Sequence, residues 1–457
     1  ILSETYADEY GQVVRSMNAG VCIDSLFDGR GNARTTFTHG EYEVEGMLNA
    51  YIYDPDGNQT AELVNAEWDA HGNICVGQNT IVTSTIYDEL GNIVSETDGE
   101  GNVTGYSYTE DKKLSAIALP GAKSLSRRFL YAQKTEDGSF ADQTFDAKNH
   151  RSETVTNAAG QTLSIADYGD GDETVRTRYE YDSVGNQTRQ INGNGSYVVY
   201  TYDEKQQCIR DEGFNASGTK VSDTFYEYDD RGHVIRMKDY KREEGVMTPS
   251  CITFYQYNQK GLLVSEGQIM QNLNPTEEQI QSALTTYRYD EKNNLIEVTY
   301  PDNQDGITGE YLEYNTKQQL VAVKAVKKGE TAKRTLRTYA YNGRGSVREI
   351  RENLSFANGK TDSWLIKTYQ YDAVDRVRQI QYAKSSDNQV FEQYTYEYDR
   401  NSNITKETLK RENEEVREQT YTAQGQLAGT QVTIDGVSRQ PYRYTYDIVG
   451  NRTSVQH

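Results

Sequence analysis

Cysteine, proline and long apolar runs are all scarce in this sequence. Its 457 residues include only four cysteines and six prolines. The cysteines lie far apart and share no metal-ligand spacing, so neither a zinc site nor a disulfide scaffold is indicated, although their pairing state stays open: Cys22, Cys75, Cys208 and Cys251. No apolar run approaches the roughly 18 residues that a membrane span needs. Few prolines are expected where most backbone N–H groups pair in a sheet.

Positive charge is also in short supply. The chain has 48 Lys and Arg against 69 Asp and Glu, a net charge of -21. Because phosphate binding needs an excess of Lys and Arg, this balance argues against nucleic acids and anionic membranes as partners. The five histidines are scattered, at His39, His71, His150, His233 and His457. With no nucleophile elbow, phosphate loop or metal-binding helix, we predict no catalytic, cofactor or metal site, and we expect a protein that is not an enzyme.

Tyrosine, by contrast, occurs 37 times and recurs in one motif. In Tyr179-Glu180-Tyr181-Asp182, the two tyrosines project to one face of a strand. Asp182 and Gly185 suit the first and fourth positions of a type I turn, and Gly185 can take the left-handed conformation from which a bulged return strand leaves. One copy of the motif therefore encodes one end of a β-hairpin.

The motif repeats along the chain with substitutions that keep its turn chemistry. The turn position is held by Asp182, Asp203, Asp229, Asn258, Asp290, Asn315, Asn342, Asp372, Asp399, Thr422 and Asp447. The 265 residues from first to last make ten intervals, a mean of 26.5. A second turn lies midway in the shorter intervals, as at Asn192-Gly193-Asn194-Gly195. This periodicity predicts an all-β fold, a continuous up-and-down antiparallel sheet of repeated hairpins.

No linker or compositional break interrupts the repeats, so we predict a single array over residues 1–457. Its copies are weaker over 1–48, regular over 49–109, irregular over 110–176 and regular over 177–457. We expect Tyr179, Tyr181, Tyr226 and Tyr228 to pack in ladders against equivalent residues of neighbouring repeats.

A short helix is expected near residues 275–284, inserted into a connection between strands. Asn274 is the N-cap candidate and Pro275 takes the first helical position, followed by acidic residues in the first turn. Ile280, Ala283 and Leu284 fall on one side and should lie against the sheet.

The recurring Tyr-x-Tyr-Asp-x-x-Gly-Asn, interleaved with segments such as Asp98-Gly99-Glu100-Gly101-Asn102, resembles the YD-repeat (Rhs) family over nearly the whole chain. That family includes bacterial Rhs and cell-wall-associated toxins, shell components of insecticidal toxin complexes, and animal teneurins. The resemblance implies a long β-ribbon that spirals into a hollow cocoon, which encloses a cargo polypeptide in the toxins and serves extracellular adhesion in teneurins.

The sequence departs from the family's pattern in two ways, which limit the functions that the resemblance implies. Bacterial toxins of the family usually close the shell with a core segment in which self-cleavage follows an Asp-Pro-x-Gly signature. The only such sequence here, Asp54 to Gly57, lies in an ordinary repeat, so no cleavage residue can be assigned. The cysteine-rich modules of a teneurin are missing, which favours a bacterial source. Because it starts at Ile1 rather than Met and ends in mid-array, the sequence is typical of an excised or mature segment.

Two functions fit these features. The leading hypothesis is a non-catalytic shell segment of a bacterial secreted or cell-surface protein, with a toxin-like or other polypeptide cargo, or adjoining parts of its own chain, as partner. The alternative is an extracellular adhesion or glycan-binding module, because exposed Tyr and Trp can stack on sugars. The terminal strands of a ribbon lack neighbours, so we expect either an edge-to-edge dimer or capping by residues 1–48.

Overall fold

The computed structural model describes residues 3–41, 43, 45–121, 126–135, 138–169, 174–301, 306–355, 363–386 and 388–456. These residues form antiparallel strands and one short helix, which confirms the all-β prediction. The chain divides into two compact units, which we describe separately: residues 1–127, 312–324 and 334–457, and residues 128–311 and 325–333. The prediction of a single array stays a prediction. No helix in the described ranges is long and apolar enough to cross a bilayer.

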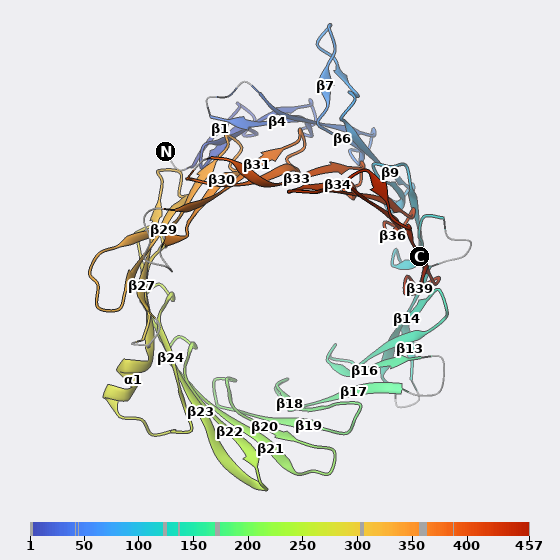
Figure 1. The fold of residues 1–457 in the computed structure, drawn as a ribbon. Helices are drawn as coiled ribbons and strands as arrows, with labels where there is room; N and C mark the ends of the chain where they lie inside the picture. Colours follow the sequence, from blue (N-terminus) through green and yellow to red (C-terminus); the bar gives the residue numbers. More distant parts are fainter. Residues whose placement is uncertain are drawn as a thin grey trace. The chain divides into compact units, whose positions relative to one another are not determined.

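The first unit holds an early and a late run of strands, labelled in Figure 1. The early strands are β1 (Ser3–Ala7), β2 (Val13–Asn18), β3 (Val21–Phe27), β4 (Ala33–Gly40), β5 (Gly46–Tyr53), β6 (Gln59–Val64), β7 (Glu67–Trp68), β8 (Ile74–Cys75), β9 (Ile81–Tyr87), β10 (Ile93–Thr97), β11 (Val103–Tyr108) and β12 (Leu114–Ala118). The late strands are β29 (Arg334–Tyr341), β30 (Val347–Asn353), β31 (Trp364–Tyr371), β32 (Val377–Lys384), β33 (Val390–Tyr398), β34 (Ile404–Lys410), β35 (Glu414–Tyr421), β36 (Leu427–Ile434), β37 (Val437–Ser438), β38 (Tyr442–Tyr446) and β39 (Arg452–Gln456), preceded by β28 (Leu320–Lys327).

The second unit continues the same pattern of hairpins and contains the helix. Its elements are β13 (Arg127–Lys134), β14 (Phe140–Asp146), β15 (Arg151–Thr156), β16 (Thr162–Tyr168), β17 (Thr174–Tyr181), β18 (Gln187–Ile191), β19 (Tyr197–Tyr202), β20 (Cys208–Phe214), β21 (Lys220–Tyr228), β22 (Val234–Glu243), β23 (Val246–Tyr257), β24 (Leu263–Met270), α1 (Glu277–Ala283), β25 (Leu284–Tyr289), β26 (Leu295–Thr299) and β27 (Ile307–Tyr314).

Strands pair antiparallel with their neighbours in sequence, as β17, β18, β19 and β20 do. The hairpin of β7 and β8 forms a small sheet of its own, and β6 therefore pairs with β9. Among the described residues, β1 pairs with β2 alone and β39 with β38 alone, so each keeps one open edge. Whether those edges associate in a dimer stays a prediction.

The predicted turn is confirmed in atomic detail. Gly185 N–H donates to Asp182 O at 3.2 Å, and the Asp182 carboxylate accepts from the N–H groups of Val184 and Asn186. Gly185 has a φ of 102°. Copies without glycine take the same left-handed conformation at that position, with φ of 63° at Gln206, 69° at Asn293, 66° at Asp375 and 66° at Ser402. The turn hydrogen bonds therefore hold non-glycine residues in a left-handed backbone conformation that such residues rarely adopt.

The second tyrosine of the motif has a role that the sequence did not reveal. Its hydroxyl donates to the backbone carbonyl of the first residue of an earlier strand, as from Tyr181 to Thr162 at 2.9 Å and from Tyr228 to Cys208 at 2.6 Å. The other links run from Tyr53, Tyr87, Tyr108, Tyr202, Tyr289, Tyr341, Tyr371, Tyr398, Tyr421 and Tyr446. Each accepting carbonyl lies five residues after the preceding turn position, so each hairpin end is tied to the repeat before it. The predicted ladder of stacked rings stays a prediction.

The helix is confirmed, but its predicted start was wrong. Helix α1 begins at Glu277 with Thr276 as N-cap, and Pro275 precedes the helix. The reason is a capping box: Thr276 Oγ1 accepts from Gln279 N–H, and the Gln279 side chain accepts from Thr276 N–H at 2.9 Å. This reciprocal pair satisfies two backbone donors, which Asn274 as N-cap would leave to other partners.

The helix covers an apolar cluster on the sheet, as predicted. Ile280 packs against the buried cluster of Ile252, Phe254 and Leu273. Leu284 is buried and Ala283 is partly buried at the end of the helix. This apolar cluster therefore lies where the helical insertion covers one face of the sheet.

Candidate functional site

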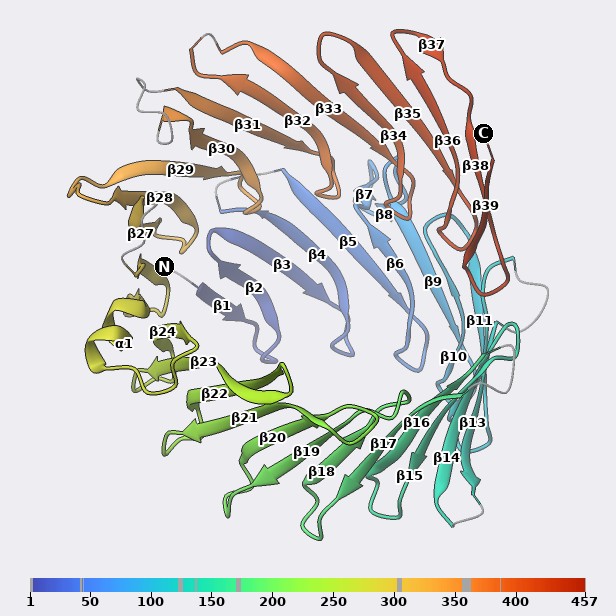
Figure 2. The ribbon, with the colours of Figure 1, turned by 60° about the horizontal axis from the view of Figure 1, so that its bottom comes forward.

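The candidate site lies in the first unit, where early and late strands meet. Figures 1 and 2 show β30 to β36 running beside β4 to β9. Arg400 N–H donates to Glu100 Oε1 at 2.6 Å, and Asn401 Nδ2 donates to Asp98 Oδ2 at 2.6 Å. Gln424 Nε2 adds a bond to Pro120 O at 3.2 Å. We call these three contacts the seam; each joins residues 300 to 304 positions apart.

A glycine allows the backbones at the seam to approach closely. A Cβ on Gly99 would lie 2.7 Å from Arg400 O, closer than real contacts allow. Gly99 follows Asp98, so the same turn that closes a hairpin also contacts the backbone of Arg400 among the late strands. The seam therefore depends on a residue that ordinary copies of the turn do not need at this position.

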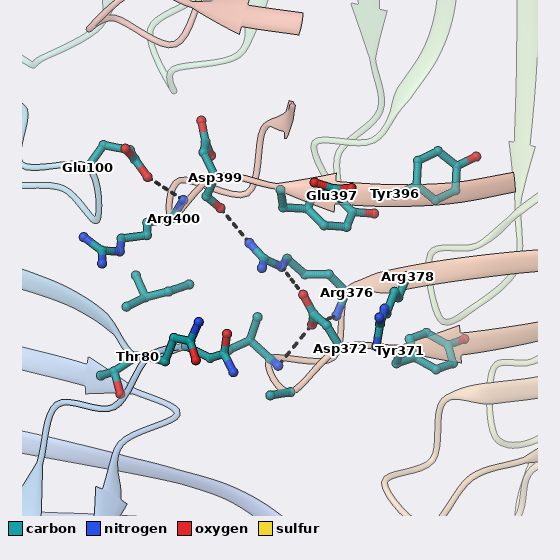
Figure 3. Close-up of a pocket in the computed structure, with 16 residues that line it drawn as sticks. Thr80, Glu100, Tyr371, Asp372, Arg376, Arg378, Tyr396, Glu397, Asp399 and Arg400 are labelled. Atoms are coloured by element: carbon teal, nitrogen blue, oxygen red, sulfur yellow. Dashed lines mark hydrogen bonds and ion pairs between the residues drawn. The ribbon is translucent and has the colours of Figure 1, made fainter. Parts of the chain in front are cut away.

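A cavity of about 720 Å³ opens beside the seam, between residues 78–81 and Glu100 on one side and residues 371–400 on the other. Tyr371, Arg376, Arg378 and Tyr396 are among the side chains that line it (Figure 3). Its size is within the range of small-ligand pockets, about 300–1,000 Å³, but its walls are strongly polar.

Arg376 fixes one wall of the cavity. Its Nε donates to Asp372 Oδ2 at 2.7 Å, and its Nη1 donates to the backbone carbonyl of Asp399 at 2.8 Å. The guanidinium also lies over the Tyr398 ring, 4.6 Å from its centroid. Because Asp372 and Asp399 belong to successive turns, Arg376 clamps two repeats together and is held rigidly while doing so.

Hydrogen bonds hold the Asp98 carboxylate in its charged form at the seam. Partial burial raises the pKa of Asp98, but hydrogen bonds from Asn102 and Asn401 outweigh it, and the pKa falls below its usual value. Burial, together with the charge of Glu407, raises the pKa of Tyr396 to about 12. At neutral pH the cavity therefore presents a neutral phenol, and Asp98 keeps its charge at the seam.

Two arginines at the cavity have unused donors. Arg378 and Arg400 are exposed, and no described residue accepts a hydrogen bond from either guanidinium or forms an ion pair with it. In Figure 3 they lie on opposite sides of the Arg376–Asp372 pair, with Arg378 near Tyr371 and Arg400 near Glu100. The guanidinium groups of Arg378 and Arg400 are therefore charged donors without a partner among the described residues.

The sequence did not single out these arginines, although a signal was present. Arg376 stands four residues after its turn position, where Asn186, Asn294 and Asn403 stand in other copies. Arg378 stands six residues after that position, where most copies have a β-branched residue such as Thr188, Ile209 or Val264. The departure at Arg376 marks the site, whereas Arg348 shares the repeat position of Arg378 and does not line the cavity.

The scattered polar residues are used within the repeats. His150 and His233 each approach the Asp of their own turn, with Nδ1 to Oδ2 distances of 3.0 and 2.9 Å. His39 Nε2 lies 3.3 Å from Asp24 Oδ2, His71 N–H donates to Asp69, and His457 is outside the described residues. Cys22, Cys75, Cys208 and Cys251 are unpaired. Within the described ranges, no group of three or more His, Cys, Asp or Glu is placed to hold a metal ion.

Comparison with known proteins gives partial matches. No family model matches the chain. It is 25% identical over 211 residues to the tRNA3(Ser)-specific nuclease WapA of Bacillus spizizenii, and 25% identical over 213 residues to the tRNA nuclease WapA of Bacillus subtilis. Each match covers 41% of this chain and 9% of the relative. A structure of the Photorhabdus luminescens Tc holotoxin pore with a mutated TccC3 aligns over 99% of this chain and 27% of its own, with 14% identity and a TM-score of 0.39.

Proposed function

The chain carries the YD repeat of the Rhs family, and on this premise we propose that it is a non-catalytic wall segment of a larger bacterial protein, whose work is to enclose or present a toxin-like or other polypeptide. Its partners are that polypeptide and adjoining segments of its own protein. Its place of action is outside the cell or at the cell surface.

The observation that carries this proposal is the seam. Repeats 300 positions apart are joined turn to turn by the contacts of Asp98, Glu100 and Pro120 with Arg400, Asn401 and Gln424. A ribbon whose late strands dock on its early strands makes a wall more than one hairpin high. Because strand pairing and tyrosine hydroxyls satisfy the backbone, such a wall needs little apolar core.

The two relatives support a larger parent protein in which the repeats and a nuclease occupy different parts of the chain. Both are named as tRNA nucleases, but the match occupies only 9% of either protein. We assign the repeat-bearing part to this chain and place any nuclease chemistry elsewhere in a parent protein. The structural roles of the turn aspartates and histidines agree with this division.

Protease protection of the full-length gene product tests the enclosing role. Under native conditions, a polypeptide other than the array should survive protease concentrations that degrade it completely after denaturation. If every non-array segment is digested as fast in the native as in the denatured protein, the enclosing role is wrong. Incubation of the purified 457-residue chain with tRNA tests the non-catalytic role. Specific cleavage of the tRNA would contradict that role.

One observation favours the alternative of a glycan-binding or adhesion module. Trp68 is 52% exposed on the β7–β8 hairpin, and exposed indole rings stack on sugars. In a glycan array, binding that Trp68→Ala abolishes but Phe140→Ala leaves unchanged would favour this alternative; Phe140 is also an exposed aromatic, at 41%. Absence of any binding would leave the wall as the better account.

A further inference from the structure

We propose that the β7–β8 hairpin docks a partner polypeptide, by pairing with an extended strand that carries Lys or Arg and lies under the ring of Trp68. The inference goes beyond the proposed function and does not depend on it, because this hairpin lies outside the ladder of strands that forms the wall. In Figure 1 the hairpin projects from the first unit beside β4 and β6.

The β7–β8 hairpin is a copy of the repeat that has lost its neighbouring strand. Its turn is complete, because Gly72 N–H donates to Asp69 O at 3.0 Å. The strand before it, β6, pairs with β9 instead of β7, and the Gln59 carbonyl of β6 accepts from the hydroxyl of Tyr87 at 3.1 Å. Among the described residues β7 pairs with β8 alone, so the other edge of β7 is open.

Trp68 occupies the motif position from which a tyrosine hydroxyl usually reaches the paired strand. Tyr181 on β17, for example, donates to the Thr162 carbonyl on β16 at 2.9 Å. Trp68 is 52% exposed, and its Nε1–H donates to no described residue. Because an indole N–H can only donate, it needs an acceptor. A strand paired with β7 would supply both a surface for the ring and a carbonyl for the N–H.

The base of the hairpin is fixed, so the open edge is held in place. Thr80 is 2% exposed, and its Oγ1 accepts from Gly77 N–H at 2.8 Å and donates to Asn65 O at 2.8 Å. Ile74 packs against the buried cluster that contains Ala66. A rigid edge loses little freedom when it binds, and backbone hydrogen bonds to such an edge supply the affinity in β-strand addition.

The charge of the hairpin favours a cationic partner strand. Residues 65–80 include two acidic side chains, Glu67 and Asp69, and no Lys or Arg. The Asp69 carboxylate accepts from the backbone of its own turn, whereas Glu67 is exposed and forms no ion pair with a described residue. A Lys or Arg on the added strand would be a stabilising cross-strand neighbour. A second copy of this chain carries the same net charge of -21 and is less suited.

The test is a titration of the 457-residue chain with a labelled, alternating Lys-Val octapeptide, followed by fluorescence anisotropy and by acrylamide quenching of tryptophan emission. Trp68 and Trp364 are the two tryptophans of the chain, so binding at Trp68 should reduce the quenching. A Glu-Val peptide reverses the charge, and a Lys-Val peptide with proline at alternate valines keeps the charge but cannot pair as a strand. Each should bind at least about tenfold more weakly.

Two variants and a matched control locate the binding. Trp68→Ala should lower the affinity for the Lys-Val peptide by about tenfold, and Trp68→Phe, which keeps a ring without the N–H, should have a smaller effect. Phe140→Ala removes another exposed aromatic and should change the affinity less than about twofold. Circular dichroism checks that the variants remain folded.

Each other outcome overturns the proposal. Equal binding of the proline peptide would show attraction by charge alone, and an equal loss with Phe140→Ala would show that Trp68 has no special role. Protection of Trp68 by cellohexaose, without binding of the Lys-Val peptide, would assign the ring to a glycan. A dimer that Trp68→Ala abolishes, again without peptide binding, would assign it to a second copy. If the peptide fails to bind while protease protection of the full-length protein persists, the proposed function stands and this docking hairpin is wrong.

Discussion

The turn at Asp182 and the turn at Asp98 are copies of one hairpin end, yet they serve different purposes. In both, the carboxylate accepts from the backbone of its own turn and from an Asn side chain four residues on. Asp98 accepts in addition from Asn401, and Gly99 lets the late backbone approach. The repeat thus builds the hairpins, and small additions to it join hairpins that are distant in sequence.

Acidification should produce the largest effect, because it acts on ordinary and seam turns together. Eight turn aspartates have pKa values lowered by hydrogen bonds: Asp28, Asp54, Asp69, Asp88, Asp98, Asp182, Asp229 and Asp290. A folded pKa below the unfolded value of 3.8 gives stability that is present above pH 4 and lost as pH falls further. Urea midpoints should therefore fall steeply between pH 4 and 2.

One turn allows this pH dependence to be assigned. The His233 side chain, followed by backbone N–H groups, lowers the pKa of Asp229 to about 2. Asp229→Asn should lower the urea midpoint at pH 6 and reduce its fall toward pH 2. Asp230→Asn, which changes an exposed neighbour in the same turn, should do neither. An identical pH profile for wild type and Asp229→Asn would contradict the role of the turn carboxylate.

Gly99→Ala should give the next largest effect and separates the seam from ordinary turns. The new methyl group meets Arg400 O, and such overpacking costs about 1–3 kcal/mol in the free energy of unfolding. Gly29→Ala is the matched control, because Gly29 also follows a turn Asp and has no atom within 4 Å of an added Cβ. Thermal unfolding should show a lower Tm for Gly99→Ala alone. Equal shifts would mean that the seam is not closely packed.

Asn401→Ala should cost less, about 1 kcal/mol, because it removes one hydrogen bond to a carboxylate that keeps its other partners. Faster amide hydrogen exchange should appear at Arg400 and at neighbouring seam residues, with little change elsewhere. Lys205 holds the equivalent position in the turn at Asp203 and is exposed, so Lys205→Ala serves as control. Uniform acceleration across the chain would contradict a local seam.

Tyr181→Phe should cost less than Asn401→Ala, about 0.5 kcal/mol, because the lost hydroxyl bond to Thr162 O joins two neutral groups. Tyr179→Phe removes a hydroxyl that has no hydrogen bond to any described residue, so it should change stability less. Urea denaturation of the two variants measures the difference. Equal effects would show that the two tyrosines of the motif are interchangeable.

The hairpins could be read from the sequence because each depends on residues close together. Asp182, Gly185 and their equivalents satisfy local hydrogen bonds, and Gln206 and Ser402 kept the same turn without glycine. The tyrosine hydroxyl bonds were missed because Thr162 and Tyr181 come from different repeats. Every residue has a backbone carbonyl, so the sequence does not show which one accepts the bond. The seam was missed for the same reason, because nothing near Asp98 indicates that Asn401 approaches it.

The tyrosine hydroxyl bonds also bear on how such a chain can change length during evolution. Each bond reaches a backbone carbonyl, and every repeat offers one at the same place whatever its side chains are. Loss or duplication of a whole repeat would thus leave the bonds between remaining neighbours intact. The seam follows a different rule: it matches residues 300 to 304 positions apart, so a change of one repeat would present Asp98 with the wrong turn. The few seam residues therefore constrain the number of repeats between the early and late strands. The bonds between neighbouring hairpins do not depend on that number.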